Sequence, residues 1–215
     1  MEGIALRTPA TDPEALARAS LIRRAKLLAW LGLGWHAIEG AIAIGAGIVA
    51  GSIALVGFGA DSVIELAAGV IVLWRFADRR AESTDAEHRA HRLIAVSFWA
   101  IAAYVSVEAI RTLAGGSHPD VSWVGIGLAA LTLGTMPPLG AAKARLADRL
   151  HSQSVRSEGR QNLVCAYLSL ALLLGLGANA AFGAWWADPA AALVVAAVAA
   201  NEGREAWRGD DDHCC

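Results

Sequence analysis

Two acidic residues stand four positions apart inside a long apolar segment, in the stretch Gly59-Ala-Asp61-Ser-Val-Ile-Glu65. Residues four apart share one face of a helix, so both carboxylates would point to the same spot. A carboxylate near the centre of a bilayer costs at least about 2.5 kcal/mol. Two neighbouring carboxylates also repel each other unless a proton or a cation lies between them. The spacing favours a cation site or a proton relay; acids hydrogen-bonded to neighbouring helices are the structural alternative.

Two further polar pairs also lie in apolar segments. His36 and Glu39 are three apart and share a helix face. They either act with the acids as ligands or make a satisfied polar contact. Gln161 and Cys165 are four apart. A buried cysteine usually behaves as a small apolar side chain. This second pair therefore indicates a metal site only if the other candidate ligands face it.

Two other groups of residues have competing interpretations. Glu108 precedes Arg111 by three positions, so it either lines an exit path or pairs with that arginine. The last six residues, Asp210–Cys215, combine carboxylate, imidazole and thiol groups. Such a tail either captures Zn²⁺ or a similar ion, or is an acidic end without a role.

The elements that must position these residues are apolar segments of membrane-spanning length. A spanning helix needs about 20 apolar residues. Five segments meet that length and a sixth, shorter one begins near Asp188-Pro189. The predicted spans are 27–50, 53–74, 93–113, 121–141, 163–185 and a last one with an apolar core over 190–200. The prolines of Met136-Pro137-Pro138 are expected to bend or end the fourth span.

Composition agrees with a membrane protein, because charged residues make up 18% of the chain against about 25% in soluble domains. The net charge of -2 gives no indication of a nucleic-acid partner. Of the 18 Lys and Arg residues, all but Arg111 fall on one side of the predicted spans. Positive loops stay in the cytoplasm, so both termini are expected there. The fold class is therefore an all-α bundle of six transmembrane helices.

Three parts of the chain are expected. Residues 1–24 form a cytoplasmic N-terminal segment, 25–208 the six-helix transmembrane domain, and 209–215 the Asp/His/Cys tail. Thr11-Asp12-Pro13-Glu14 has the pattern of a helix start, so the segment 14–26 is expected to be a cytoplasmic or interfacial extension of the first span. The alternative is a solvated leader without a specific role.

These residues resemble the cation diffusion facilitators. The run from Gly51 to Glu65 is similar to that family's Ser-x-Ala-Leu…Asp-Ser-x-x-Asp stretch. The run from Ser152 to Cys165 is similar to its Ser-x-Ala-Leu-x-Ala-Asp-Ala-x-His-x-x-x-Asp stretch. The resemblance covers about residues 25–208 and is closest to a small branch of the family that lacks the C-terminal cytoplasmic domain.

The resemblance implies a metal site made of two residues on the second span and two on the fifth, which here are Asp61, Glu65, Gln161 and Cys165. His36 or Glu39 would supply a ligand where Gln161 replaces the family's histidine. It further implies a non-enzymatic exporter in the cell membrane, without a resident cofactor. This exporter would move Zn²⁺, or else Co²⁺, Cd²⁺ or Fe²⁺, by exchange with protons, usually as a homodimer.

Two other functions stay open on the sequence alone. One is a membrane protein that senses or buffers metal, or regulates a partner, with the tail as its working part. The other is a proton-coupled carrier of an organic cation, which would need a larger cavity.

Overall fold

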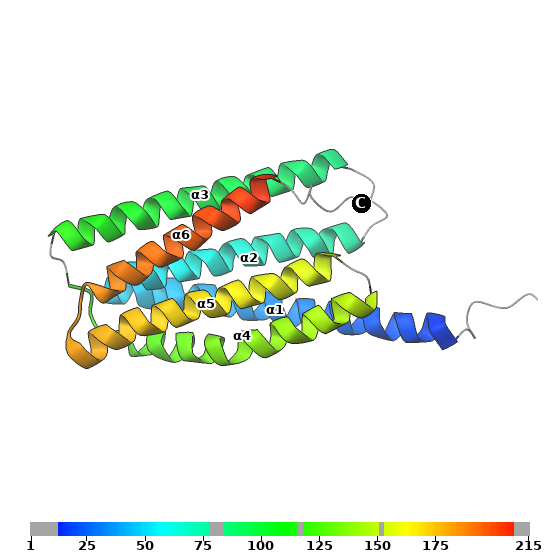
Figure 1. Ribbon diagram of the computed structural model, residues 1–215, viewed down its shortest axis with the longest axis horizontal. Coiled ribbons are helices and arrows are strands. Elements are labelled where there is room, and N and C mark those ends of the chain that lie inside the picture. The colour runs from blue at the N-terminus through cyan, green and yellow to red at the C-terminus, as the bar shows by residue number, and fades with distance from the viewer. Residues whose placement is uncertain (1–12, 78–83, 116–117, 151–152, 209–215) are drawn as a thin grey trace, which may run out of the picture.

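A computed structural model describes residues 13–77, 84–115, 118–150 and 153–208. Its helices run side by side in one elongated bundle (Figure 1). They are α1 Pro13–Ala50, α2 Ile53–Ala77, α3 Thr84–Gly115, α4 Trp123–Leu150, α5 Gln153–Phe182 and α6 Ala187–Arg208. The described ranges contain no strand. The all-α, six-helix prediction is confirmed.

Within the part of the chain that the structure describes, four helices contain a segment long and apolar enough to cross a membrane. These segments are Ala19–Ala50, Ala95–Gly115, Trp123–Leu150 and Glu158–Phe182. Large apolar side chains are exposed on the outside of the bundle, among them Val49 and Phe182, each 86% exposed. Such a surface is stable against lipid and unfavourable in water. The chain is therefore a multi-pass integral membrane protein.

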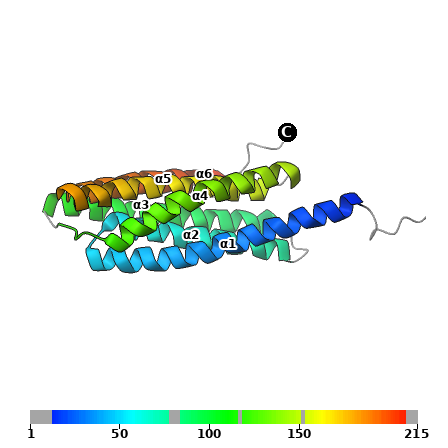
Figure 2. The ribbon, with the colours of Figure 1, turned by 90° about the horizontal axis from the view of Figure 1, so that it is seen from below.

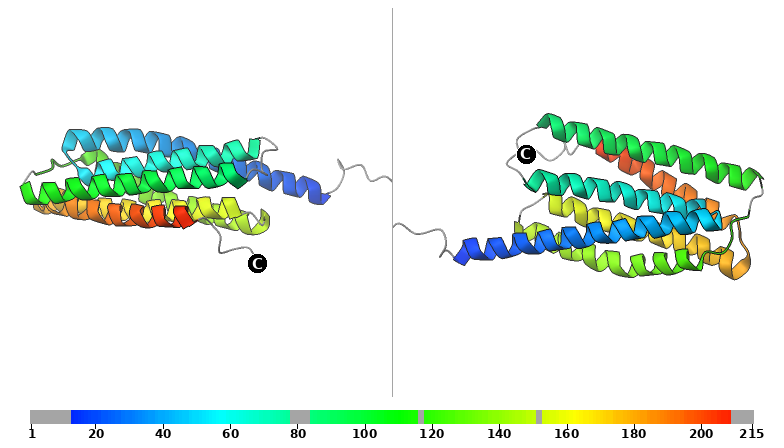
Figure 3. Two further views of the ribbon diagram at one scale, coloured as in Figure 1. Left: turned by 90° about the horizontal axis from the view of Figure 1, so that it is seen from above. Right: turned by 180° about the vertical axis from the view of Figure 1, so that it is seen from behind.

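The helices pack as three close pairs, α1 with α2, α3 with α6, and α4 with α5 (Figures 1 and 3). Small residues allow the first pair to approach, because a Cβ atom on Gly59 would lie 2.9 Å from the Cβ of Ala43. Gly51 joins α1 and α2 with a φ of 66°, which glycine adopts without strain. The predicted short hairpin between the first two spans is therefore present.

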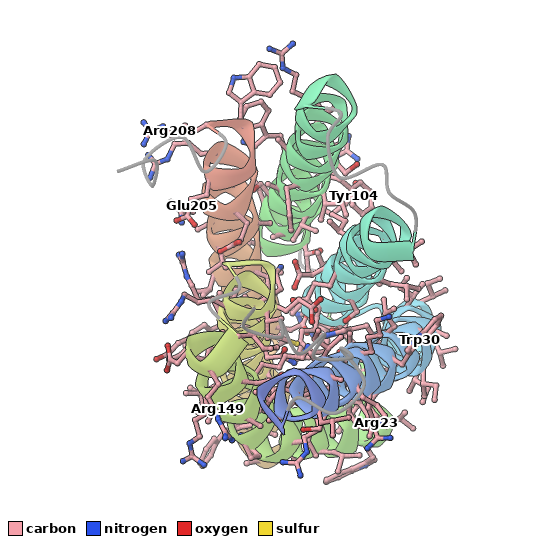
Figure 4. All side chains as sticks on the ribbon, turned by 90° about the vertical axis from the view of Figure 1, so that its right-hand side faces the viewer. Arg23, Trp30, Tyr104, Arg149, Glu205 and Arg208 are labelled. Carbon is pink, nitrogen blue, oxygen red and sulfur yellow. The ribbon has the colours of Figure 1, made fainter. Side chains whose placement is uncertain are left out.

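One end of the bundle carries the positive charge. Arg23, Arg149 and Arg208 surround this end in Figure 4, which views the bundle along its length. The N-terminal part of α1 extends beyond the other helices there (Figure 2). Thus residues 14–26 continue the first span as helix, as expected. Thr11, Asp12 and the tail 210–215 lie outside the described residues.

The opposite end is fastened by a polar contact between two hairpins. Ser52 donates a hydrogen bond of 2.5 Å to the carboxylate of Asp188, which is fully buried at the start of α6. The Ser52 hydroxyl also accepts from the backbone N–H of Leu55, which caps α2. The backbone N–H groups of Ile53 and Ala54 point to the same Asp188 carboxylate. Asp188 thus ties α6 to the start of α2.

The fourth and fifth spans differ from their predicted limits. Pro137 and Pro138 lie inside α4, which continues to Leu150 instead of ending near 141. The helix tolerates the two lost N–H donors and bends (Figure 1). As a result Lys143, which the sequence placed in a cytoplasmic loop, is a buried residue of α4, 4% exposed. Helix α5 begins at Gln153, in agreement with the expectation that the fifth span starts before 163, and ends at Phe182, before the predicted 185.

Candidate metal centre

The polar residues singled out in the sequence come from three helices. His36 and Glu39 lie on α1, Asp61 and Glu65 on α2, and Cys165 on α5. All five are buried, and Glu39 and Cys165 have no exposed surface. Each pair occupies one helix face because its members are three or four apart. The bundle therefore brings the inward faces of these three helices together.

Three of these side chains meet at one point. One possible ligand atom each from His36, Glu65 and Cys165 lies within 4.8 Å of the other two. The Nδ1 atom of His36 lies 2.9 Å from Oε2 of Glu65. A nitrogen, a carboxylate oxygen and a sulfur so close together are a ligand set typical of Zn²⁺ and its chemical neighbours.

Glu39 is surrounded by hydrogen-bond donors. Its Oε2 accepts from Ser62 at 3.1 Å and lies 3.3 Å from Nδ1 of His36. The thiol of Cys165 lies 3.8 Å from the same oxygen. The hydroxyl of Thr132, from α4, donates to Oε1. Glu39 is therefore satisfied by donors of the protein itself, and its Oε2 and that of Glu65 both approach Nδ1 of His36.

Glu65 is bonded quite differently. Its Oε2 forms an ion pair of 2.9 Å with Nδ1 of His36, and among the described residues its carboxylate oxygens have no other hydrogen-bond partner. Within the same described part of the chain, Oδ2 of Asp61, one turn away on the same helix, has no hydrogen-bond partner. Buried oxygens without donors are costly unless something else neutralises them. In contrast to Glu39, Glu65 and the neighbouring Asp61 therefore have carboxylate oxygens that are available to a cation.

Of the remaining sequence candidates, Asp61 and Gln161 lie one helical turn from Glu65 and Cys165, whereas Glu108 lies on α3, outside the centre. Asp61 repels Glu65 electrostatically but is not part of the three-residue group. Gln161, one turn before Cys165, is only partly buried, and its role as a ligand stays a prediction. Glu108 forms an ion pair of 2.7 Å with Arg111, so the pairing interpretation of Glu108 is confirmed.

Sequence reasoning missed the residues that support the centre from outside it. Thr132 and Ser62 donate to Glu39, and Lys143 lies deeper in the bundle than its sequence position indicated. Ser62 adjoins the acid pair, but a serine in an apolar helix usually bonds to its own backbone. Only the packing of α4 against α1 identifies Thr132.

The comparison with protein families agrees with the geometry. The family model described as the cation efflux transmembrane domain matches residues 37–208, well over half of the chain. No curated protein matches the chain.

Proposed function

Because the chain belongs to the cation efflux family, we propose that it transports a divalent metal cation across the membrane, with Zn²⁺ as the first candidate. The observation that carries this proposal is the group of His36, Glu65 and Cys165, whose ligand atoms lie within 4.8 Å of one another inside the bundle. Membership of the family supports cation efflux in general. The choice of Zn²⁺ as the first candidate rests on the chemistry of the three ligands.

His36, Glu65 and Cys165 supply three ligands of different type, and Asp61 or Gln161 completes a tetrahedral set. Zn²⁺ accepts nitrogen, oxygen and sulfur ligands in this geometry. Cd²⁺ gains from the thiolate, while Co²⁺ and Fe²⁺ accept the imidazole and the carboxylate. Ca²⁺ and Mg²⁺ prefer oxygen ligands alone, so we expect the protein to discriminate against both.

Exchange with protons completes the proposal. A thiol must lose its proton to bind a metal, and a protonated carboxyl group must do the same. Protons on Cys165 and on the acids of α2 therefore leave as the ion enters, and protons return when it departs. The expected direction is metal export, driven by protons that enter down their own gradient. We also propose the homodimer that the family resemblance implies, which light scattering in detergent would measure.

The test is metal flux into proteoliposomes with an imposed pH gradient, one ion at a time. Glu65→Gln removes a carboxylate that no hydrogen bond satisfies, and we expect flux to fall to the level of protein-free vesicles. Glu108→Gln is the matched control, because this glutamate pairs with Arg111 outside the centre; its flux should equal wild type.

Three results would contradict parts of this proposal. Wild-type protein that binds metal but shows no flux would favour the sensing or buffering alternative. Competition by organic cations but not by metals would support the organic-cation carrier instead. Flux that survives Glu65→Gln, in protein shown to be folded, would leave transport standing but remove the centre from the pathway.

A further inference from the structure

A buried lysine stands close to the candidate metal centre and takes no part in the function proposed above. The ammonium of Lys143 donates to Oδ1 of Asn162 at 3.0 Å and lies 3.2 Å from Oε2 of Glu158. The lysine side chain is 5% exposed and the glutamate side chain 21%. A charged group inside a transmembrane bundle is costly and usually has a role in ion movement.

Lys143 lies on α4, beside two of the three helices that form the centre, α1 and α5. On α1, Gly32 precedes His36 by four residues and shares its face; on α5, Asn162 precedes Cys165 by three and shares its face. A Cβ atom on Gly32 would lie 3.2 Å from the Lys143 ammonium nitrogen. One helical turn, about 6 Å, therefore separates the ammonium from the level of His36, on the side of the positively charged end.

The backbones of α4 and α5 approach closely beside Lys143, because a Cβ atom on Gly140 would lie 2.9 Å from the carbonyl oxygen of Gly159. The ammonium lies between these two helices and Gly32 of α1. Asn162 also bonds to Met136 of α4 at 2.9 Å, which fixes the partner of the ammonium.

We propose that Lys143 is the cytoplasmic gate of the metal centre: its ammonium, held by Glu158 and Asn162, closes the seam between α1, α4 and α5 until it moves away from Gly32. The carboxylates of the centre attract the ammonium, whereas a bound dication repels it. This inference rests on the proposed cation transport, because it assigns the side from which the ion reaches the centre.

Cys165 provides a direct test that needs no metal flux. The full chain carrying Cys214→Ser and Cys215→Ser keeps Cys165 as its single cysteine. In membrane vesicles with the cytoplasmic side outward, its labelling rate is measured with a cationic and a neutral methanethiosulfonate reagent of similar size. Removal of the positive charge by Lys143→Met should raise the cationic rate at least about tenfold while changing the neutral rate much less.

Three further variants separate the gate from general loosening of the bundle. Lys143→Arg should keep the wild-type ratio of cationic to neutral labelling. Glu158→Gln should lower that ratio, because the ammonium loses its counter-charge. Arg156→Met is the matched control, since Arg156 pairs with Asp148 on the exposed surface where α4 and α5 adjoin; it should leave both rates unchanged.

An unchanged ratio in both Lys143→Met and Glu158→Gln would overturn the gate. So would a ratio that responds only to Glu202→Gln, because Glu202 of α6 interacts electrostatically with Asp61 and Glu65 and marks the other approach to the centre. Labelling of Cys165 does not require transport. The labelling ratio therefore tests the gate, whereas metal flux tests the proposed transport, and failure of one can be distinguished from failure of the other.

Discussion

At the scale of single residues, the two buried glutamates of the centre have opposite surroundings. Glu39 receives hydroxyl donors from Thr132 and Ser62, whereas Glu65, among the described residues, has only the ion pair with His36. A buried carboxylate with donors is fixed in place, and one without donors gains most from a cation. We therefore assign Glu39 to positioning His36 and Glu65 to binding the ion.

This assignment predicts the effect of Thr132→Val, which removes one donor to Glu39 and keeps the shape of the side chain. Residues behind metal ligands typically contribute about 10–100-fold in affinity, so the dissociation constant for Zn²⁺ should rise by about tenfold or more. Competition with a fluorescent chelator in detergent measures it. Thr135→Val is the control, because that hydroxyl bonds to the carbonyl of Leu131 in its own helix. Equal affinities for the two variants would refute the positioning role of Glu39.

At the same scale, residue types and spacing in the sequence predict part of this centre. His36 with Glu39 and Asp61 with Glu65 are recognisable because each pair shares a helix face in an apolar segment. The donor from Thr132 is not recognisable, since it depends on how α4 packs against α1. Which of two acids is left without a partner is likewise a property of the tertiary structure.

At the scale of helices, apolar length predicts that a helix exists but says little about where it ends. The prolines of α4 remove two backbone donors, yet packing against α5 carries the helix on to Leu150. Hydropathy therefore assigned Lys143 to a loop, although Asn162 and Glu158 satisfy its charge inside the bundle. Asp188 at the start of α6 is a second polar residue whose partner, Ser52, comes from a distant hairpin.

The Asp188 contact predicts a loss of stability. Asp188→Ala leaves the hydroxyl of Ser52 without its acceptor and weakens the cap of α2, so the folded state should lose about 1–2 kcal/mol. Thermal unfolding in detergent would show a lower midpoint. Asp120→Ala, at the same end but with an exposed side chain, should change the midpoint little. If the two midpoints fall equally, Asp188 does not join the hairpins.

At the scale of the whole molecule, Arg23, Arg149 and Arg208, which come from three different helices, lie toward one end of the bundle (Figure 4). The distribution of charge in the sequence thus predicts which helix ends lie together, because the positive-inside rule depends on loops and helix ends and not on packing; the cytoplasmic location of this end stays a prediction. The relative placement of the helices depends instead on small residues such as Gly59, and hydropathy does not encode it.

This topology predicts the sidedness of two surface positions, tested with the tail cysteines replaced by serine. Arg149→Cys should react with a membrane-impermeant thiol reagent only from the cytoplasm, and Asp120→Cys only from the outside. Intact cells and inverted vesicles distinguish the two. Reaction of both positions from one side would contradict an even number of crossings.

The central claim is that a divalent cation binds inside the bundle to His36, Glu65 and Cys165. X-ray absorption spectroscopy of the Zn²⁺-loaded full chain, with Cys214→Ser and Cys215→Ser, measures the ligands directly. We predict one sulfur at about 2.3 Å and nitrogen or oxygen ligands at about 2.0–2.2 Å, with the sulfur lost in Cys165→Ser. A zinc ion bound without sulfur before that substitution would contradict the claim.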